Sequence, residues 1–274
     1  MTQHFQRPGD PLFTQRTPRV VAASKLHRRR DREKAGRFLA EGPQAVREAL
    51  AVGAVRDIFV TEDGRRRHRD LLHGASSAHF SVVTDEAMAA LADTVTPQGV
   101  IAVCDLRDVP LEAALARRPK LVAVAVEIRD PGNAGTILRT ADAAGATAVV
   151  FAGDAVDPYN SKCVRASAGS LFHLDVVRAP DAPAALAALR GAGLRTLATS
   201  GYGATDLDDL LDDGSLAQPT AWLFGSEAHG LPDDLRDAAD AAVRVPIHGR
   251  AESLNLAAAA AVCLYASARA QRPR

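Results

Sequence analysis

The sequence has few aromatic residues, few cysteines and no long apolar run. Aromatic residues make up 4% of the 274 residues, and the chain carries only 3 Cys. Cys104, Cys163 and Cys263 lie far apart and lack the spacing of a metal site, so we expect reduced packing residues in a cytoplasmic protein and no metal centre. No apolar run approaches the ~20 residues of a membrane span, and the polar stretch Met1–Asp10 lacks the apolar core of a signal peptide. These absences exclude a disulfide-stapled secreted domain and a membrane-spanning protein.

The charges balance over the whole chain but are distributed unevenly along it. The formal net charge is +0, yet Arg16–Arg69 holds 15 Lys or Arg and 7 Asp or Glu, a local net charge of +8. Most of the excess lies in KLHRRRDREKAGR (Lys25–Arg37) and RRRHR (Arg65–Arg69). Basic patches attract phosphate backbones, although a charge run can also be a solvated helix face. We favour RNA contact, and the candidate residues here are Lys25, Arg28, Arg29 and Arg30.

The first part of the chain has the pattern of a small α/β module behind a flexible tail. Proline and glycine interrupt residues 1–18, which we predict to be the tail. Short apolar runs alternate with amphipathic stretches over 19–108, the predicted first domain; a linker at 109–119 and a second domain at 120–274 follow. In the first domain we expect helices at 25–34, 41–53, 67–72 and 86–91, and strands at 38–39, 55–60, 80–83 and 99–104.

The second domain has the pattern of a parallel sheet covered by helices. It opens with LVAVAVEI (Leu121–Ile128), a continuous apolar run typical of a strand buried on both faces. Strand-like and helix-like segments then alternate, which indicates helices on both faces of a parallel sheet. Further strands are predicted at 148–151, 171–176, 196–199, 222–224 and 242–245, and helices at 135–144, 161–168, 182–191, 233–238 and 257–265.

Three stretches of the second domain share one design. They are VEIRDPGNAGTILRTADAAGA (Val126–Ala146), AWLFGSEAHGLP (Ala221–Pro232) and VRVPIHGRAESLNLAAAAAVCLY (Val243–Tyr265). Each runs from an apolar strand through a Gly-containing turn into a helix-like segment, and each places polar residues at the carboxyl end of a strand. Open parallel sheets form ligand sites at that edge. Each stretch alone is also compatible with an ordinary strand–loop–helix unit, because short motifs have low specificity.

Together the three stretches resemble the signature motifs of the SpoU (TrmH-like) branch of the knotted SPOUT RNA methyltransferases. The matching features are N-x-G-x-x-x-R-T-A, F-G-S-E-x-x-G-L and V-P-x-x-G-x-x-E-S-L-N, in the family's order. The string FLAEGPQAVREAL also resembles the substrate-binding domain of many SpoU enzymes. The resemblance implies a C-terminal α/β-knot (SPOUT) methyltransferase domain, a small N-terminal α/β RNA-binding domain, S-adenosylmethionine as cofactor and a homodimer. The implied substrate is ribosomal RNA, above all 23S, or transfer RNA; neither DNA nor a membrane is expected as a partner.

The resemblance also assigns residues. Methyl transfer to a ribose 2′-hydroxyl requires alignment of the reacting atoms and removal of a proton. Arginine is not deprotonated in proteins, so we expect Arg139 to orient a phosphate and stabilise the developing oxyanion; the alternative is a structural pair with Asp142. The implied catalytic residues are Asn133, Arg139, Glu227, Ser253 and Asn255, the cofactor residues are Thr199, Gly225, Val245, Ile247 and Leu254, and two further RNA contacts are Lys162 and Arg165.

Two other classes of protein fit the sequence less well. A non-catalytic RNA-binding protein of the same fold would not need Arg139, Glu227 and Asn255, which are all present. A nicotinamide-dependent enzyme needs G-x-G-x-x-G after the first strand, and DPGNAG (Asp130–Gly135) does not fit that pattern. Ribosomal RNA and transfer RNA members of the family share these motifs.

Overall fold

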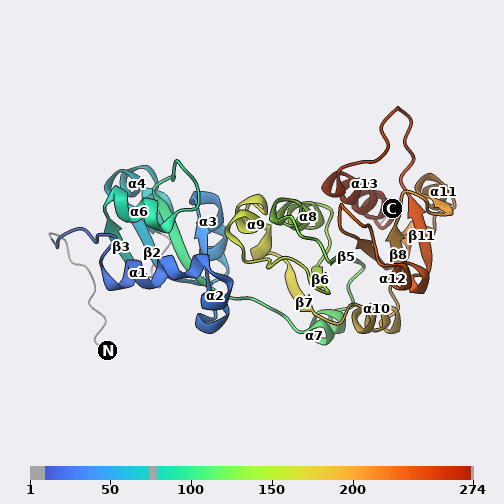
Figure 1. Cartoon of the computed structure of the whole chain (residues 1–274), viewed down its shortest axis with the longest axis horizontal. Helices are drawn as coiled ribbons and strands as arrows, with labels where there is room; N and C mark the ends of the chain where they lie inside the picture. The colour runs from blue at the N-terminus through green and yellow to red at the C-terminus, as the bar shows by residue number, and fades with distance from the viewer. Residues whose placement is uncertain (1–9, 74–78, 273–274) are drawn as a thin grey trace. The chain divides into compact units, whose positions relative to one another are not determined.

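The computed structural model describes residues 10–73 and 79–272, and the chain divides into two compact units (Figure 1). The first unit contains the chain up to Leu106 together with Tyr159–Phe172. The second contains Arg107–Pro158 and His173–Arg274. Over the described ranges, no helix combines the length and apolar character needed to cross a membrane.

The first unit is a four-stranded sheet with helices on both faces. The strand order is β1-β4-β2-β3; β4 runs antiparallel to both its neighbours, while β2 and β3 are parallel. One face packs against α1 and α6, and α3 covers the other. The strands are β1 (Arg37–Glu41), β2 (Val55–Thr61), β3 (His79–Val83) and β4 (Val100–Asp105). The helices are α1 (Pro18–Ser24), α2 (Arg29–Ala35), α3 (Pro43–Ala51), α4 (Glu62–Arg67), α5 (Arg69–His73), α6 (Asp85–Leu91) and α9 (Ser161–Ala166), with 3-10 turns η1 (Lys25–His27) and η2 (Ser170–Phe172).

The start of the first unit differs from the prediction. Residues 1–9 of the predicted tail lie outside the described residues, and Phe13 is already bonded to the sheet: its N–H donates to Val82 and its carbonyl accepts from Thr84. The predicted helix at 25–34 is the 3-10 turn η1 followed by the separate helix α2, because the chain is extended at Arg28. Buried Arg32 holds this turn by donating from Nη1 to the carbonyls of Leu26 and His27, each at 2.8 Å.

The second unit is a seven-stranded, all-parallel sheet in the order β7-β6-β5-β10-β8-β11-β9. All six residues of β5 are buried, as its apolar run predicts. The strands are β5 (Leu121–Val126), β6 (Ala148–Ala152), β7 (Asp175–Ala179), β8 (Arg195–Thr199), β9 (Thr205–Asp206), β10 (Thr220–Phe224) and β11 (Ala241–Arg244). The helices are α7 (Leu111–Ala116), α8 (Pro131–Ala143), α10 (Ala182–Gly191), α11 (Leu207–Asp212), α12 (Asp233–Ala238) and α13 (Leu256–Ala270), with the 3-10 turn η3 (Ser215–Ala217).

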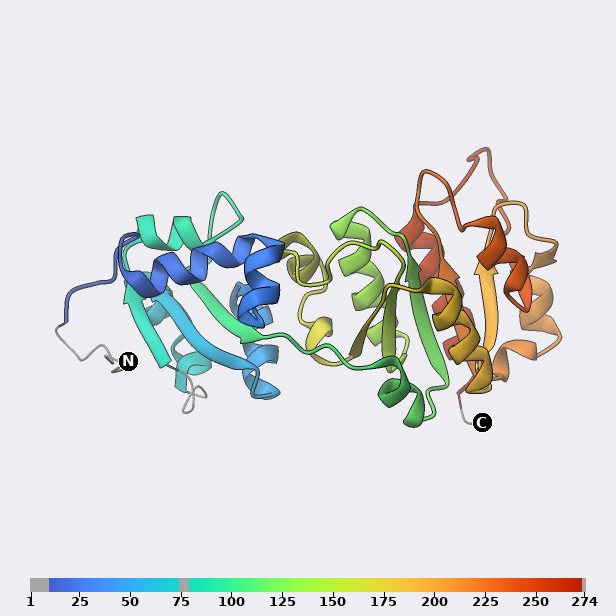
Figure 2. The ribbon, with the colours of Figure 1, turned by 60° about the horizontal axis from the view of Figure 1, so that its bottom comes forward.

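Helices cover both faces of this sheet (Figures 1 and 2). One face packs against α7, α10 and α12 in a continuous apolar cluster. On the other face, α8 and α13 lie against each other and against β5. There the indole N–H of buried Trp222 donates to Ser267 Oγ at 2.8 Å, which fixes α13 on β10. The predicted linker contains α7, which packs against β7 and α10.

Three elements of the structure differ from the predictions for the second domain, for identifiable reasons. The strand predicted at 171–176 is wrong: Ser170–Phe172 forms a 3-10 turn in the first unit, and the strand β7 begins at Asp175. Helix α8 begins at Pro131 rather than 135, because Asp130 accepts from the N–H of Asn133 as its N-cap. Helix α11 was not predicted, since its Asp-rich sequence has little apolar periodicity.

Candidate functional site

Polar residues from the three motif stretches meet in the second unit. Asn133 lies in the first turn of α8, Glu227 lies in the loop after β10, and Asn255 is the N-cap of α13. Asn133 Nδ2 donates to Glu227 Oε1, and Asn255 Nδ2 donates to Asn133 Oδ1 at 3.4 Å. The structure thus joins residues 122 positions apart into one hydrogen-bonded chain, which we call the Asn133–Glu227–Asn255 chain.

The helix cap of α13 sets the direction of this chain. Asn255 Oδ1 accepts from the N–H groups of Ala257 and Ala258, at 2.9 and 3.3 Å. Its amide NH₂ therefore faces Asn133, whose own NH₂ then faces Glu227. Glu227 Oε1 accepts the last of these hydrogen bonds. The first turns of two helices also carry partial positive charge, which favours anions at this place.

The loop that carries Glu227 is closed tightly on itself. Ser226 and Gly230 exchange two backbone hydrogen bonds, of 3.0 and 2.8 Å, and Gly230 has a φ of +70°. A Cβ on Gly225 would lie 2.2 Å from the Gly230 carbonyl carbon and 2.3 Å from Leu231 N. Gly225 is therefore required by its own loop. This contact is a structural reason for the glycine that the sequence did not reveal.

The predicted cofactor residues follow three neighbouring strands. Thr199 ends β8, Gly225 follows β10 and Val245 follows β11, and these strands are adjacent in the order β10-β8-β11. Thr199 Oγ1 donates to the Leu223 carbonyl at 2.8 Å, which links two of the strand ends. Ile247 and Leu254 belong to an exposed loop, residues 247–255, that extends from β11 to α13 (Figure 1); their side chains are 38% and 40% exposed.

Arg139 and Ser253 lie outside the Asn133–Glu227–Asn255 chain. Arg139 is exposed on α8 and makes no hydrogen bond or ion pair with another residue that the structure describes. Its predicted alternative partner, Asp142, is instead hydrogen-bonded to His173 Nδ1 at 2.8 Å. Ser253 lies in the exposed loop and does not cap α13, because Asn255 does. Both residues are exposed to solvent.

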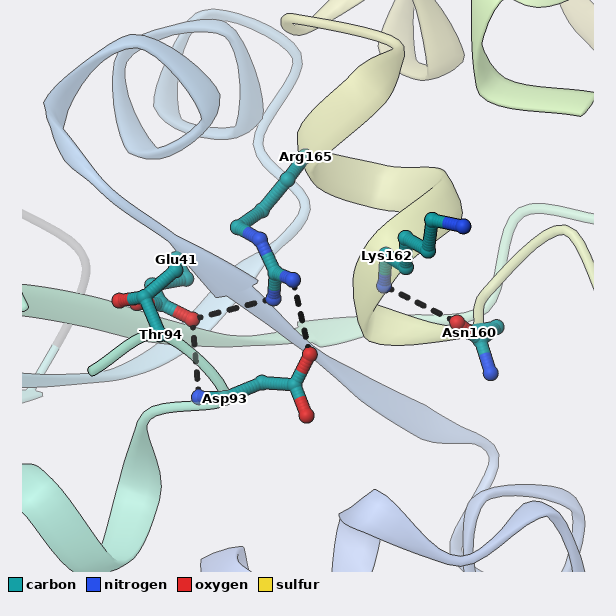
Figure 3. A network of polar contacts seen from close by, with 6 residues as sticks. All are labelled: Glu41, Asp93, Thr94, Asn160, Lys162 and Arg165. Atoms are coloured by element: carbon teal, nitrogen blue, oxygen red, sulfur yellow. Dashed lines mark hydrogen bonds and ion pairs between the residues drawn. The ribbon is translucent and has the colours of Figure 1, made fainter. Parts of the chain in front are cut away.

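The predicted RNA contacts fall into two groups. Lys25, Arg28, Arg29 and Arg30 are exposed at the junction of η1 and α2, where Arg29 pairs with Glu33 at 2.9 Å. Figure 3 shows the second group: Lys162 lies in the first turn of α9, and Arg165 lies between Glu41 and Asp93, at 3.4 and 2.8 Å. The Arg165 guanidinium thus ties α9 to β1 and to the loop after α6. A phosphate contact at Arg165 would compete with these two carboxylates.

Two other features limit the chemistry of the site. Among the residues described, no group of His, Cys, Asp or Glu is placed to hold a metal ion. All three cysteines are buried, and burial raises the pKa of Cys263 to about 12, so its thiol is not a nucleophile. Glu127 was not predicted as a site residue, although it follows β5 at the same edge of the sheet. Its φ of +51° is unusual for a residue with a side chain. Its position at the end of the buried LVAVAVEI run was the available signal.

These observations define an α/β protein with a polar site at the carboxyl ends of a parallel sheet. Residues 120–265 match the SpoU rRNA Methylase family, and residues 17–102 match the MRM3-like substrate binding domain. The chain therefore belongs to the SpoU rRNA methylase family.

Relatives of known activity align with most of the chain. The 23S rRNA (guanosine(2553)-2'-O)-methyltransferase RlmP of Bacillus subtilis is 36% identical over 242 residues, or 88% of this chain and 92% of that protein. A 23S rRNA (uridine(2479)-2'-O)-methyltransferase of Streptomyces viridochromogenes is 34% identical over 89% of this chain and 86% of that one. The crystal structure of the SpoU methyltransferase AviRb from Streptomyces viridochromogenes, in complex with AdoMet, aligns with a TM-score of 0.80 and 32% identity over 93% of this chain and 98% of that chain.

Proposed function

We propose that this protein is an S-adenosylmethionine-dependent RNA 2′-O-ribose methyltransferase that acts on ribosomal RNA, with 23S RNA as the first candidate. The observation that carries the proposal is the Asn133–Glu227–Asn255 chain, which brings the three family motifs to one edge of the sheet. The activities of the relatives support the same reaction.

The types of group that follow β10 and β11 are suitable for binding S-adenosylmethionine. Backbone groups after β10 and β11 offer donors and acceptors to an adenine edge and a ribose, and the exposed apolar side chains of Ile247 and Leu254 can cover a purine face. When bound, the cofactor supplies an electrophilic methyl group. We assign Thr199, Gly225, Val245, Ile247 and Leu254 to its binding.

The protein side chains then have to position the acceptor and manage its charge. Glu227 ends a hydrogen-bonded chain anchored on two helices, so its carboxylate is held in a fixed place. A fixed carboxylate can orient the ribose hydroxyls and accept a proton. Arg139 has a free, planar guanidinium that can hold a phosphate or stabilise the oxyanion formed as the hydroxyl loses its proton. Ser253 is accessible in the loop before α13 and completes the proposed catalytic set.

The other parts of the molecule have proposed roles as well. We assign RNA binding to the first unit, through Lys25, Arg28, Arg29, Arg30 and Lys162, with Arg165 anchoring α9. We further propose a cytoplasmic location and a trefoil knot in the second unit, both on the resemblance to the family.

We propose a homodimer that uses the outer face of α13. Ala258, Val262, Tyr265 and Arg269 are all exposed at a spacing that places them on one stripe of this helix, with Val262 42% and Tyr265 50% exposed. Large apolar side chains in such a stripe are typical of a helix that packs against a partner.

Mapping of ribose methylation tests the proposed function. Ribosomal and transfer RNA from a deletion strain and its parent would be compared by resistance of the 2′-O-methylated linkages to alkaline cleavage. We expect one ribosomal position to lose its methyl group, and the purified chain to restore it with S-adenosylmethionine. An unchanged methylation map, with RNA bound by the purified chain, would favour the non-catalytic RNA-binding alternative.

A further inference from the structure

The first unit has a pocket whose lining combines apolar and cationic side chains. It measures about 410 Å³ and is lined by Arg65, Arg66, Arg69, Leu72, His73 and Phe80. We call it the Phe80 pocket. It is separate from the Lys25–Arg30 cluster and from the network around Arg165.

Phe80 is unusual in its exposure. It lies on β3, the edge strand of the first sheet, and is 47% exposed. In the described part of the first unit it is the only aromatic residue among the exposed large hydrophobic side chains. An exposed aromatic ring forgoes the free energy of burial and presents a flat face on which another ring can stack.

The arginines of the pocket project from a fixed backbone. A Cβ on Gly64 would lie 2.2 Å from the Gly99 carbonyl oxygen, so α4 packs directly on the start of β4. Thr61 caps this helix by accepting from the N–H of Gly64 at 3.0 Å. His68 is hydrogen-bonded to the Gln98 carbonyl at 3.0 Å, which holds the turn between α4 and α5. The Phe80 pocket is therefore preformed on one side.

The guanidinium groups at its rim are available to an anion. Arg65 pairs with Glu62 at 3.0 Å and Arg66 with Asp63 at 3.6 Å, both on the surface of α4. Exposed pairs of this kind are weak, so a phosphate can replace the carboxylate. Arg69 has no ion pair with any residue that the structure describes.

We propose that the Phe80 pocket binds one unpaired nucleotide of the RNA substrate. The base stacks on Phe80 beside Leu72, and the adjoining phosphates contact Arg65, Arg66 and Arg69. This inference rests on the proposed function, because it assigns a subsite for the same RNA. Aromatic rings interleaved with basic residues are typical of single-strand recognition, whereas a duplex keeps its base faces covered by its own stacking. An acidic protein partner would use the arginines but would have no need of the exposed ring.

The test measures binding of the full-length chain to two labelled RNAs, an unstructured oligouridine and a blunt duplex, by fluorescence anisotropy over a range of salt concentrations. Phe80→Ala should weaken oligouridine binding roughly 5- to 150-fold, the range that corresponds to loss of one stacked base, and should leave the salt dependence unchanged. Phe80→Tyr should retain the affinity. Arg69→Gln should lower the salt slope by about 0.7, the value for one single-strand phosphate, whereas Arg67→Gln, on α4 but not among the residues that line the pocket, should not.

Methyl-donor binding and methyl transfer are measured on the same preparations, with thermal stability as a check on folding. Wild-type oligouridine affinity in Phe80→Ala would overturn the pocket assignment and leave the proposed enzyme standing. Equal weakening of duplex and single-strand binding would also overturn it, because the ring would then not be reading an unpaired base. Selective loss of single-strand binding, with normal donor affinity, would establish the subsite.

Discussion

The environment of Arg139 favours a functional role over a structural one. It is exposed, lies six residues after Asn133 and so about 9 Å further along α8, and has no partner among the described residues. A guanidinium that only stabilised the helix would be expected to pair with a carboxylate such as Asp142. This one is instead free to meet a substrate.

Arg139→Ala should therefore lower the single-turnover rate of methyl transfer by about 10²–10³, the effect of losing one preorganised charge-stabilising donor. Arg139→Lys should recover little, because an ammonium lacks the planar fork of a guanidinium. Donor affinity and melting temperature should stay at wild-type values. Arg129→Ala, which removes another exposed arginine paired only with Asp154, is the matched control. Normal turnover in Arg139→Ala would remove this residue from the mechanism.

Asn255 has two roles that can be separated by substitution. Its Oδ1 caps α13 and its Nδ2 donates to Asn133. Asp is an equally good N-cap but has no donor, so Asn255→Asp should keep stability and slow methyl transfer roughly 10- to 100-fold by releasing Asn133 and Glu227. Asn255→Ala should in addition lose about 1 kcal/mol of unfolding free energy. Chemical denaturation and single-turnover assays on both variants check this; a fully active Asn255→Asp would show that Asn255 is only a cap.

At the scale of elements, Asp240 connects two neighbouring strands of the second sheet. Its Oδ2 accepts from the N–H and the hydroxyl of fully buried Thr196, both at 2.8 Å, and its Oδ1 pairs with Arg190 at 2.9 Å. Burial opposes ionisation, but the hydrogen bonds from Thr196 and the charge of Arg190 outweigh it, so the pKa of Asp240 lies below its usual 3.8.

A lowered folded-state pKa stabilises the protein above the unfolded pKa and loses that contribution as the pH falls towards the folded value. Because Asp240 is exposed and solvent screens its charge, Asp240→Asn should cost about 0.5–1 kcal/mol of unfolding free energy at neutral pH. The difference from wild type should begin to shrink below about pH 4, where the carboxylate of the unfolded chain takes up a proton, and should be lost as the pH falls past the lower pKa of the folded chain. Denaturant titrations at several pH values measure it, with Asp237→Asn as control, since Asp237 is exposed and pairs only with Arg236. A difference that did not change with pH would contradict this origin.

Helices could be predicted where the sequence contains both an apolar periodicity and a residue that marks the start of the helix. Helices α10 and α12 occupy the predicted ranges, because each follows a Pro or Asp and carries apolar residues at helical spacing. The strand predicted at 171–176 was wrong because Leu171 and Phe172 are buried in the first unit, in a 3-10 turn, and not in a strand of the second unit. A short apolar run does not indicate in which unit's hydrophobic core its side chains are buried.

The candidate site was predictable only through the order of its three motifs. Spacing placed Asn133, Glu227 and Asn255 after strands, but the hydrogen bonds that join them depend on which strands are neighbours. The same holds for Arg165: an arginine on a short helix indicates RNA, and only the fold brings Glu41 and Asp93 to it.

At the scale of the whole molecule, residues 159–172 lie between two stretches of the second unit in the sequence but belong to the first unit. Tyr159 and Phe172 belong to the first unit and are 1% and 3% exposed, with ring centroids 4.8 and 5.9 Å from that of Phe38. A chain that starts at Lys120 keeps both rings but loses Phe38. It should therefore bind a hydrophobic dye and melt at a lower temperature than the full chain, by calorimetry. A truncated chain as stable as the full one, without dye binding, would contradict this.

The proposed homodimer can be tested on the outer stripe of α13. The inner face of this helix is buried against its own unit at Ala257, Ala260 and Cys263, so substitutions on the outer face should leave the fold intact. Val262→Glu together with Tyr265→Glu would place two charges in the proposed interface, where an unpaired buried charge is strongly unfavourable.

Light scattering coupled to size exclusion should give twice the chain mass for wild type and the single chain mass for this double variant. Val52→Glu, which adds a charge at an exposed apolar position of the first unit, should remain dimeric. A wild-type chain that is a monomer at micromolar concentration would rule out this interface, and the exposed stripe would then have to be explained by contact with RNA.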